Sequence, residues 1–479
     1  MRRKIGVDIM DNEKICNAYN LVGIIDNKNV WYNNNTGIIT LSSKDIEKKE
    51  LLESYTSLFP KANTDLKSNH RKIKIDGLII NVAEACNMKC TYCFANEGTY
   101  DNIHGGIMSY ENLCVLINKV FDIYPKGTSG ICFFGGEPLL AFSEIKKFIP
   151  YVIDLYNKKQ LPLPVFSINT NGTLLNEEII SFINKFHISV TVSIDGDKEN
   201  HDRMRIFKDG TGTYDTIKEN LLRIKDKKFV LFCESTITEE YMMSYKKNDI
   251  RSYVNNLYTL GFDNYALFTV DYSDTKKMDL SLYKSKIEEI YSDLIEYTFE
   301  QLLSEDNWIK ATTQLVASIE GIVKHKMRLS CGAGKSTLFS TVNMEIYPCQ
   351  MYYQAKKGRF CSVTEDELNE RIDSFIPACR FNINECKECI AYRICSLWCG
   401  GASLLFGGSA QSVVESRCVA QRKIVEQIIL HLVKIRKSEE SYKRLVHNLK
   451  NFSNIYSSDA LLSNKIYEKF EENNNGFRG

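Results

Sequence analysis

The 479-residue sequence has no excess of charge of either sign, since 61 lysines and arginines stand against 60 aspartates and glutamates. A nucleic-acid-binding chain usually carries a basic excess, so this balance argues against nucleic acid as a partner. The chain also lacks an apolar run long enough to cross a bilayer, and no sustained apolar stretch of a signal peptide follows Met1-Arg2-Arg3-Lys4. With no membrane segment and no internal repeat, we expect a soluble cytoplasmic protein of two or three domains.

Cysteine, in contrast, is abundant, with 16 residues. Disulfides are disfavoured in a reducing compartment, where grouped cysteines more often bind metal or do chemistry. One group of three lies near residue 90, and nine cysteines fall between Cys331 and Cys418. Five cysteines outside the recognisable spacings are simply explained as core side chains: Cys16, Cys114, Cys132, Cys233 and Cys361.

From about residue 73, strand-like apolar runs alternate with helical patterns. One helix is expected to begin at Ser109, a suitable N-cap with Glu111 in the first turn. Six strands alternating with six helices predict an α/β fold with a parallel sheet and helices packed outside it. Periodicity alone does not choose between an open doubly wound sheet and a partial barrel, but in both the site lies at the carboxyl ends of the strands. The strand-like runs cover 78–82, 130–134, 165–169, 189–194, 229–236 and 265–270, and the later helices 143–158, 176–186, 213–226, 249–261 and 279–304.

The flanking segments differ from this repeating core. Residues 1–72 predict three short strands (21–25, 28–32 and 37–41), a helix at 44–58 and a polar linker. A helix is expected at 311–326, a cysteine-rich segment of little regular periodicity at 331–418, and amphipathic helix at 419–450. We therefore predict four parts: 1–72, 73–310, 311–420 and 421–479.

Cys86, Cys90 and Cys93 form a C-x3-C-x2-C run directly after the first strand of the core. Four thiolates normally hold a [4Fe–4S] cluster, so a run of three leaves one iron without a protein ligand. An open iron can bind a small molecule, as the open position of a catalytic zinc site does. The run therefore predicts a redox enzyme with its cofactor in the first loop of the sheet.

Later motifs extend this pattern, and together they resemble the signature of the radical S-adenosylmethionine (SAM) enzymes. Gly135-Gly136-Glu137-Pro138 follows the second strand, and polar residues end the third and fourth strands in the order that the family shows. The resemblance implies a partial TIM-like barrel of six β/α units in which Cys86, Cys90 and Cys93 hold the cluster that cleaves SAM. The 5′-deoxyadenosyl radical so formed abstracts a hydrogen atom from a substrate, while the protein orients the reactants.

The resemblance also implies the residues that hold SAM. Gly135 and Gly136 let the backbone come close, and Glu137 accepts the amino group of the methionine moiety. Arg205, a fixed fork of donors, suits the SAM carboxylate. Tyr92 corresponds to the aromatic residue beside adenine, and three side chains correspond to segments that hold the ribose hydroxyls and the carboxylate: Ser167, Asn169 and Ser193.

The second group of cysteines contains the run Cys386-x2-Cys389-x5-Cys395-x3-Cys399. With three further cysteines it matches the SPASM extension, which carries two auxiliary [4Fe–4S] clusters in many peptide-modifying radical SAM enzymes. The resemblance implies three clusters in all, with an outer auxiliary cluster on Cys386, Cys389, Cys395 and Cys418 and an inner one on Cys331, Cys349 and Cys399.

Several readings of this segment stay open. Thr337 stands where some relatives have another cysteine, so the inner cluster either has an open iron for a substrate cysteine or is closed by Cys379. Cys-x2-Cys pairs also suit structural zinc, although seven thiolates beside such a core fit iron better. Gly332–Thr337 resembles the end of a nucleotide-binding P-loop, but Leu329 replaces the required earlier glycine.

Across nearly its whole length the chain resembles the SPASM-type radical SAM peptide maturases of the sactipeptide and ranthipeptide type. The resemblance implies a cysteine-rich precursor peptide as substrate, a flavodoxin or ferredoxin-type electron donor, and a thioether product formed when a cysteine sulfur attacks the activated carbon. Alternatives are a carbon–carbon crosslink, epimerisation, formylglycine formation, or a non-catalytic iron–sulfur or leader-binding scaffold.

The N-terminal part resembles a winged-helix leader-recognition domain, at whose sheet edge a leader peptide would add a strand. The alternative is a capping subdomain that binds no ligand.

Overall fold

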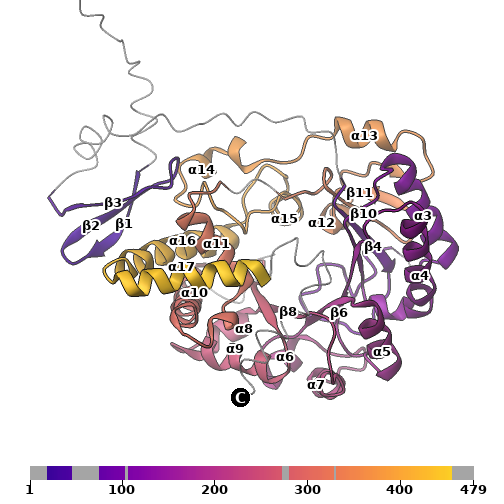
Figure 1. The fold of residues 1–479 in the computed structure, drawn as a ribbon, viewed down its shortest axis with the longest axis horizontal. Coiled ribbons are helices and arrows are strands. Elements are labelled where there is room, and N and C mark those ends of the chain that lie inside the picture. Colours follow the sequence, from indigo (N-terminus) through magenta and orange to yellow (C-terminus); the bar gives the residue numbers. More distant parts are fainter. Residues whose placement is uncertain (1–18, 46–74, 103–105, 272–279, 328–330, 456–479) are drawn as a thin grey trace, which may run out of the picture.

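The computed structural model describes residues 19–45, 75–102, 106–271, 280–327 and 331–455. These residues form a nine-stranded sheet flanked by helices and a separate three-stranded sheet (Figure 1). The predicted helix at 44–58 falls almost wholly, and the predicted linker at 63–72 wholly, outside the described residues. Among the helices that are described, none combines the length and the apolar character needed to cross a membrane.

Six parallel strands make up the core of the large sheet, and they lie side by side in chain order. A doubly wound sheet reverses its strand order, so this uninterrupted order identifies a partial barrel and confirms the predicted (β/α)6 fold. The strands fall where the sequence placed them: β4 (Gly77–Ala83), β5 (Gly130–Gly135), β6 (Val165–Thr170), β7 (Ser189–Ser193), β8 (Leu231–Ile237) and β9 (Asn264–Thr269).

Each predicted core helix is present. The Ser109 hydroxyl caps the first of them by accepting a hydrogen bond from the Asn112 N–H at 3.2 Å. Two short polar helices, α6 (Lys198–Met204) and α8 (Glu239–Ser244), were not predicted because six or seven residues show no apolar period. The predicted helices are α3 (Tyr110–Ile123), α4 (Phe142–Lys158), α5 (Glu177–Phe186), α7 (Tyr214–Leu222, which ends four residues earlier than expected), α9 (Asp249–Thr259) and α10 (Leu280–Leu303).

Alternation along the strands separates the two faces of the sheet. On β6, Phe166 and Ile168 are buried beneath the helices, whereas Ser167 and Asn169 on the other face are only half-buried. Successive side chains of a strand point to opposite faces, so the polar members of this pattern line the inner face of the partial barrel.

The cysteine-rich segment continues the sheet of the barrel. Strand β10 (Thr337–Ser340) pairs parallel with β4, and β11 (Glu345–Tyr347) and β12 (Cys361–Ser362) add two antiparallel strands at this edge. Short helices follow: α12 (Gln350–Gln354), α13 (Leu368–Ser374), α14 (Asn384–Lys387) and α15 (Gly400–Gly407).

Three longer helices complete the C-terminal half: α11 (Thr313–Val323), α16 (Glu415–Ile435) and α17 (Glu439–Ile455). Helix α16 packs along α10 of the barrel, and the predicted boundary between residues 420 and 421 falls inside it. The predicted single helical stretch at 419–450 is therefore two helices, separated at 436–438.

The three-stranded sheet is antiparallel, as predicted, with strands β1 (Tyr19–Ile25), β2 (Lys28–Asn33) and β3 (Ile39–Ser43) in chain order. It lies against α16 in Figure 1, and a methyl group on Gly23 of β1 would come within 3.2 Å of Leu430. The Asn34 side-chain amide donates a hydrogen bond to the Cys389 carbonyl at 3.0 Å. The N-terminal sheet is thus attached to the C-terminal part of the chain.

One ion pair joins the end of β9 to α16. The Arg417 guanidinium donates to both carboxylate oxygens of Asp271, a largely buried residue, and also reaches the Leu397 carbonyl. Such a two-pronged contact fixes orientation as well as distance. It holds the cysteine-rich segment against the open edge of the barrel.

We predict that Arg417→Met lowers the free energy of unfolding by about 3 kcal/mol, because it leaves the Asp271 carboxylate buried without its partner. Urea denaturation measures the loss. Arg371→Met is the control, since its pair with Glu367 is exposed on α13 and is worth less than about 1 kcal/mol. Equal losses in the two variants would contradict this role of Arg417.

Candidate active site

The loop after β4 carries Cys86, Cys90 and Cys93 at the carboxyl end of the barrel strands. Burial, with a smaller contribution from the neighbouring thiols, raises the pKa of Cys86 to about 12. Burial likewise raises the pKa of Cys90 to about 11, although Arg205 pulls it down. Thiolates at these positions need a compensating positive charge, which bound iron supplies.

Within the described residues, no three His, Cys, Asp or Glu side chains converge as ligands of one metal ion would. The thiolates of an iron–sulfur cluster each bind a different iron, so they need not converge in this way. The donor set of three soft, half-buried sulfurs fits such a cluster.

Glycines allow three segments to pack together around this loop. A Cβ on Gly136 would lie 2.4 Å from the Ala85 carbonyl oxygen, and one on Gly98 would lie 2.9 Å from the Cβ of Cys86. Gly135 has a φ of +148°, which also favours glycine. The predicted Gly135-Gly136 pair therefore lies directly against the cysteine loop. Glycine is needed at Gly136 because a side chain there would collide with the backbone of that loop.

Glu137 is fully buried beside these glycines. Its carboxylate accepts hydrogen bonds from the Thr170 hydroxyl (2.7 Å), the Asn171 N–H (2.7 Å) and the Leu139 N–H (3.0 Å). Burial nevertheless raises the pKa of Glu137 to about 7. Since a carboxylate has about four acceptor positions, one remains for another donor.

The Thr170–Thr173 turn connects to the cysteine loop through amides. The Asn171 side chain donates to Asn87 Oδ1 at 2.9 Å and approaches Cys86 Sγ at 3.7 Å, and Asn87 donates to the Thr173 hydroxyl at 2.8 Å. The sequence analysis named neither Asn87 nor Asn171 as a site residue. The polar run at the end of the third strand was the available signal.

Arg205 and Tyr92, both predicted to contact SAM, meet at Asp195. The Arg205 Nε–H donates to Asp195 Oδ2 at 2.9 Å, and the Tyr92 hydroxyl donates to the same oxygen. The Arg205 guanidinium lies 5.3 Å from the centre of the Tyr92 ring. Because Nε is used by Asp195, the terminal nitrogens of Arg205 remain for Cys90 and a second anion.

His201 connects Asp195 to Arg205 through hydrogen bonds. It is fully buried, accepts from the Asp195 N–H through Nδ1 (3.2 Å) and contacts the Thr213 hydroxyl through Nε2 (2.9 Å), which in turn donates to the Arg205 carbonyl. These partners require the neutral ring with its proton on Nε2. Burial lowers the pKa of His201 to about 4, which agrees with a neutral ring.

The remaining predicted SAM contacts, Ser167, Asn169 and Ser193, lie half-buried on the inner face. Asn169 Oδ1 accepts from the Cys132 thiol at 3.7 Å, and Ser193 pairs across the sheet with Glu234 of β8. Glu234, which no motif in the sequence singled out, is exposed within the strand.

The cysteine-rich segment brings its thiols together in the two predicted sets. Cys331, Cys349 and Cys399 act on one another electrostatically, and burial chiefly raises the pKa of Cys349 to about 12. The Cys349 sulfur also comes within 3.2 Å of where a Cβ on Gly401 would lie. The second set is Cys386, Cys389, Cys395 and Cys418. Burial, followed by the influence of the neighbouring Cys395, raises the pKa of Cys386 and of Cys418 to about 12 and also raises that of Cys389.

Cys379 lies beside Arg380, next to the second set, while the preceding Ala378 packs on Gly400 next to the first. This position of Cys379 does not decide between an inner set completed by Cys379 and one left open for a substrate cysteine.

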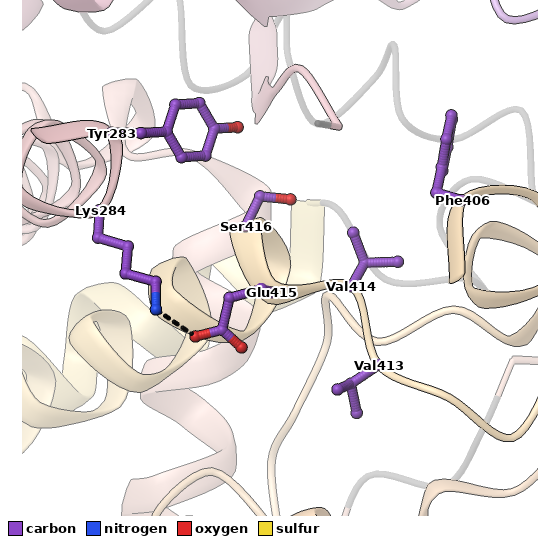
Figure 2. A pocket seen from close by; sticks show the side chains of 7 residues that line it. All are labelled: Tyr283, Lys284, Phe406, Val413, Val414, Glu415 and Ser416. Atoms are coloured by element: carbon purple, nitrogen blue, oxygen red, sulfur yellow. Dashed lines mark ion pairs between the residues drawn. The ribbon is translucent and has the colours of Figure 1, made fainter. Parts of the chain in front are cut away.

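A pocket outside these sets lies between α10 and the start of α16 (Figure 2). Lys284 and Glu415 form an ion pair in its lining, with 3.0 Å between Nζ and Oε1. None of the predicted site residues lines it. The lining side chains are Tyr283, Lys284, Phe406, Val413, Val414, Glu415 and Ser416.

We predict that acid destabilises the wild type relative to His201→Gln. The folded-state pKa of about 4 lies below the ordinary 6.5, so the contribution of His201 is complete above pH 6.5 and is lost as pH falls toward 4. Urea denaturation should show the difference between the two proteins shrinking by about 3 kcal/mol over that interval.

Glu137, whose raised pKa makes the folded state bind a proton, titrates in the same interval with the opposite sign. The two proteins are therefore compared at each pH. A difference that does not change with pH would contradict the role assigned to His201.

Comparison with known proteins agrees with this geometry. The model of the radical SAM superfamily matches residues 80–239. The chain is 27% identical over 341 residues to a cysteine-type anaerobic sulfatase-maturating enzyme of Clostridium perfringens, covering 67% of this chain and 88% of that protein. It is 25% identical over 373 residues to the radical SAM cyclopropyl synthase TigE of Paramaledivibacter caminithermalis, covering 74% of each.

A solved structure, native anSMEcpe with bound AdoMet, shares the fold. Its TM-score is 0.62 at 23% identity, and the match covers 78% of this chain and 99% of that chain. Residues 80–239 thus match the radical SAM superfamily, whose members bind S-adenosylmethionine and a [4Fe–4S] cluster.

Proposed function

We propose that this protein is a radical SAM maturase that forms thioether crosslinks in a cysteine-rich precursor peptide. The observation that carries the proposal is the pairing of a three-cysteine loop at the barrel end with two further sets of thiols in a segment that continues the same sheet. Relatives that mature sulfatases or make cyclopropyl groups support peptide or protein modification as the class of reaction.

The cluster would be held by Cys86, Cys90 and Cys93, and SAM by residues around it. Arg205, oriented by Asp195, would bind the carboxylate of SAM, and Glu137 would accept its amino group at the acceptor position still free. Side chains on the inner face, Ser167, Asn169 and Ser193, would hold the ribose. When bound, these groups supply a 5′-deoxyadenosyl radical that removes a hydrogen atom from the substrate.

The auxiliary sites would have different roles because their thiols differ in number. Four thiols in the outer set complete one cluster. The three in the inner set, Cys331, Cys349 and Cys399, leave one position for a cysteine of the substrate unless Cys379 fills it. A thioether product loses two hydrogens, one as a hydrogen atom from carbon and one as a thiol proton. An auxiliary cluster held by these thiols would accept the electron that remains.

The N-terminal sheet would receive the leader of the precursor. Among the described residues, β3 pairs with β2 alone and is therefore an edge of this sheet. An added strand at such an edge is a common way to bind an extended peptide. A flavodoxin or ferredoxin-type protein would supply the reducing electron.

We predict that anaerobic incubation with SAM, a reductant and a short cysteine-rich peptide encoded beside this chain yields a product two hydrogens lighter per crosslink. The modified cysteine should resist alkylation, since its sulfur is bonded to carbon. Mass spectrometry distinguishes the alternatives, because a carbon–carbon crosslink loses the same mass but leaves thiols alkylatable. An unchanged mass would overturn the thioether proposal.

Replacing Cys86, Cys90 and Cys93 together by Ala should reduce 5′-deoxyadenosine formation to the level without protein, because no cluster forms at the barrel end. Chromatography of the anaerobic reaction measures this product. Cys114→Ala is the matched control, since this thiol lies on α3 and approaches Tyr110. Cleavage of SAM by the triple variant, or none by the wild type, would be inconsistent with the proposal.

A further inference from the structure

The Tyr100 hydroxyl is buried and has no hydrogen-bond partner among the described residues. The whole side chain has 0% exposure. A buried polar group without a partner is costly, so nearly all such groups in native proteins are satisfied by protein, water or a ligand. The neighbouring Tyr353, whose ring centre is 5.1 Å away, shows the usual outcome, since its hydroxyl donates to Glu84 at 2.9 Å.

The surroundings of Tyr100 include the three-cysteine loop. The centre of the Tyr100 ring lies 6.2 Å from that of Phe94. Phe94 and Cys93 both pack against the buried cluster that contains Tyr100 and Tyr353. After burial itself, the largest influence raising the pKa of Tyr100 is Cys93, and Cys86 also contributes. The packing agrees with this, because Cys93 contacts the cluster that contains Tyr100, and a Cβ on Gly98, two residues before Tyr100, would lie 2.9 Å from the Cβ of Cys86.

The backbone around Tyr100 is held in an unusual conformation. Tyr100 has a φ of 54° and Asp101 one of 57°, in the left-handed region that residues other than glycine rarely adopt. The Tyr100 N–H donates to the Ala95 carbonyl at 2.8 Å, and its carbonyl accepts from Lys356. Strain of this kind persists where the surrounding structure imposes it, often at functional sites.

We propose that the Tyr100 hydroxyl donates a hydrogen bond to a sulfur of the cluster at the three-cysteine site, either a sulfide or the Cys93 ligand. This inference rests on the proposed function, since it requires a cluster on those cysteines. A donor that points its positive end at a cluster sulfur stabilises the added electron, and hydrogen bonds to the sulfurs are among the factors that set cluster potentials. Tyr100 thus makes the SAM-binding cluster easier to reduce.

The test uses the full chain, reconstituted anaerobically, with Tyr100→Phe. This change removes one oxygen and keeps the ring packing. A redox titration followed by electron paramagnetic resonance, reading the signal that SAM perturbs, should give a lower midpoint potential in the variant. Pulsed resonance in deuterated water should show one fewer exchangeable deuteron coupled to the cluster.

Tyr265→Phe is the matched control. Its hydroxyl on β9 is also buried without a partner among the described residues, but apart from burial the pKa of Tyr265 responds to Tyr297 and to no cysteine. The control should leave the potential and the coupled deuterons unchanged. Should Tyr100→Phe fail to assemble a cluster, 3-fluorotyrosine at position 100, a stronger donor, should shift the potential upward.

The two proposals fail in distinguishable ways. A SAM-perturbed signal whose potential and deuteron couplings are the same in wild type and Tyr100→Phe would overturn the hydrogen bond and leave the proposed function intact. An unchanged potential with 3-fluorotyrosine would overturn it in the same way. The absence of any SAM-perturbed signal in the reconstituted wild type would instead overturn the proposed function.

Discussion

The close approach of two backbone segments holds the site together. A Cβ on Gly98 would lie 2.4 Å from the Cα of Gly136, so the loop after the three cysteines lies directly on the loop that ends β5. A side chain at Gly98 would displace Cys86, and one at Gly136 would displace Ala85, the residue before it. This contact fixes the position of the cysteine loop relative to Glu137. Glu137 in turn is hydrogen-bonded to the end of β6.

Buried carboxylates then fix the surrounding segments. Glu84 accepts from Asn81, Asn102 and Tyr353, and Asp195 accepts from Arg205, Tyr92 and the Thr236 N–H. A buried carboxylate that lost one of these donors would be left partly unsatisfied, so each network resists local rearrangement. The cost of placing charged groups at the barrel end is thereby offset by hydrogen bonds from several separate segments of the chain.

The sequence was sufficient for the parts of this structure that depend on local pattern. Apolar periodicity located all six barrel strands, and cysteine spacing marked the three-cysteine loop. The division of the C-terminal thiols into two sets came from the resemblance to the SPASM pattern. The choice of a partial barrel required the strand order, which periodicity does not contain. Contacts such as Glu84 with Tyr353, which are 269 residues apart, were also beyond local pattern, because nothing in either segment marks the other as its partner.

Glu84 and Tyr353 also explain why the cysteine-rich segment acts as part of the barrel. Tyr353 follows Cys349 by one helical turn, and its ring contacts Tyr100 from the loop of Cys93. The aromatic cluster of Ala95, Tyr100, Phe339, Tyr347, Tyr352 and Tyr353 packs against Cys93 and Cys349 alike. Aromatic side chains in a close-packed cluster have little freedom to shift. This cluster and the pairing of β10 with β4 therefore fix the separation between the set that includes Cys93 and the set that includes Cys349. Under the proposed function, two clusters would act on one substrate and would need such a fixed separation, which a flexible linker between separate domains would not provide.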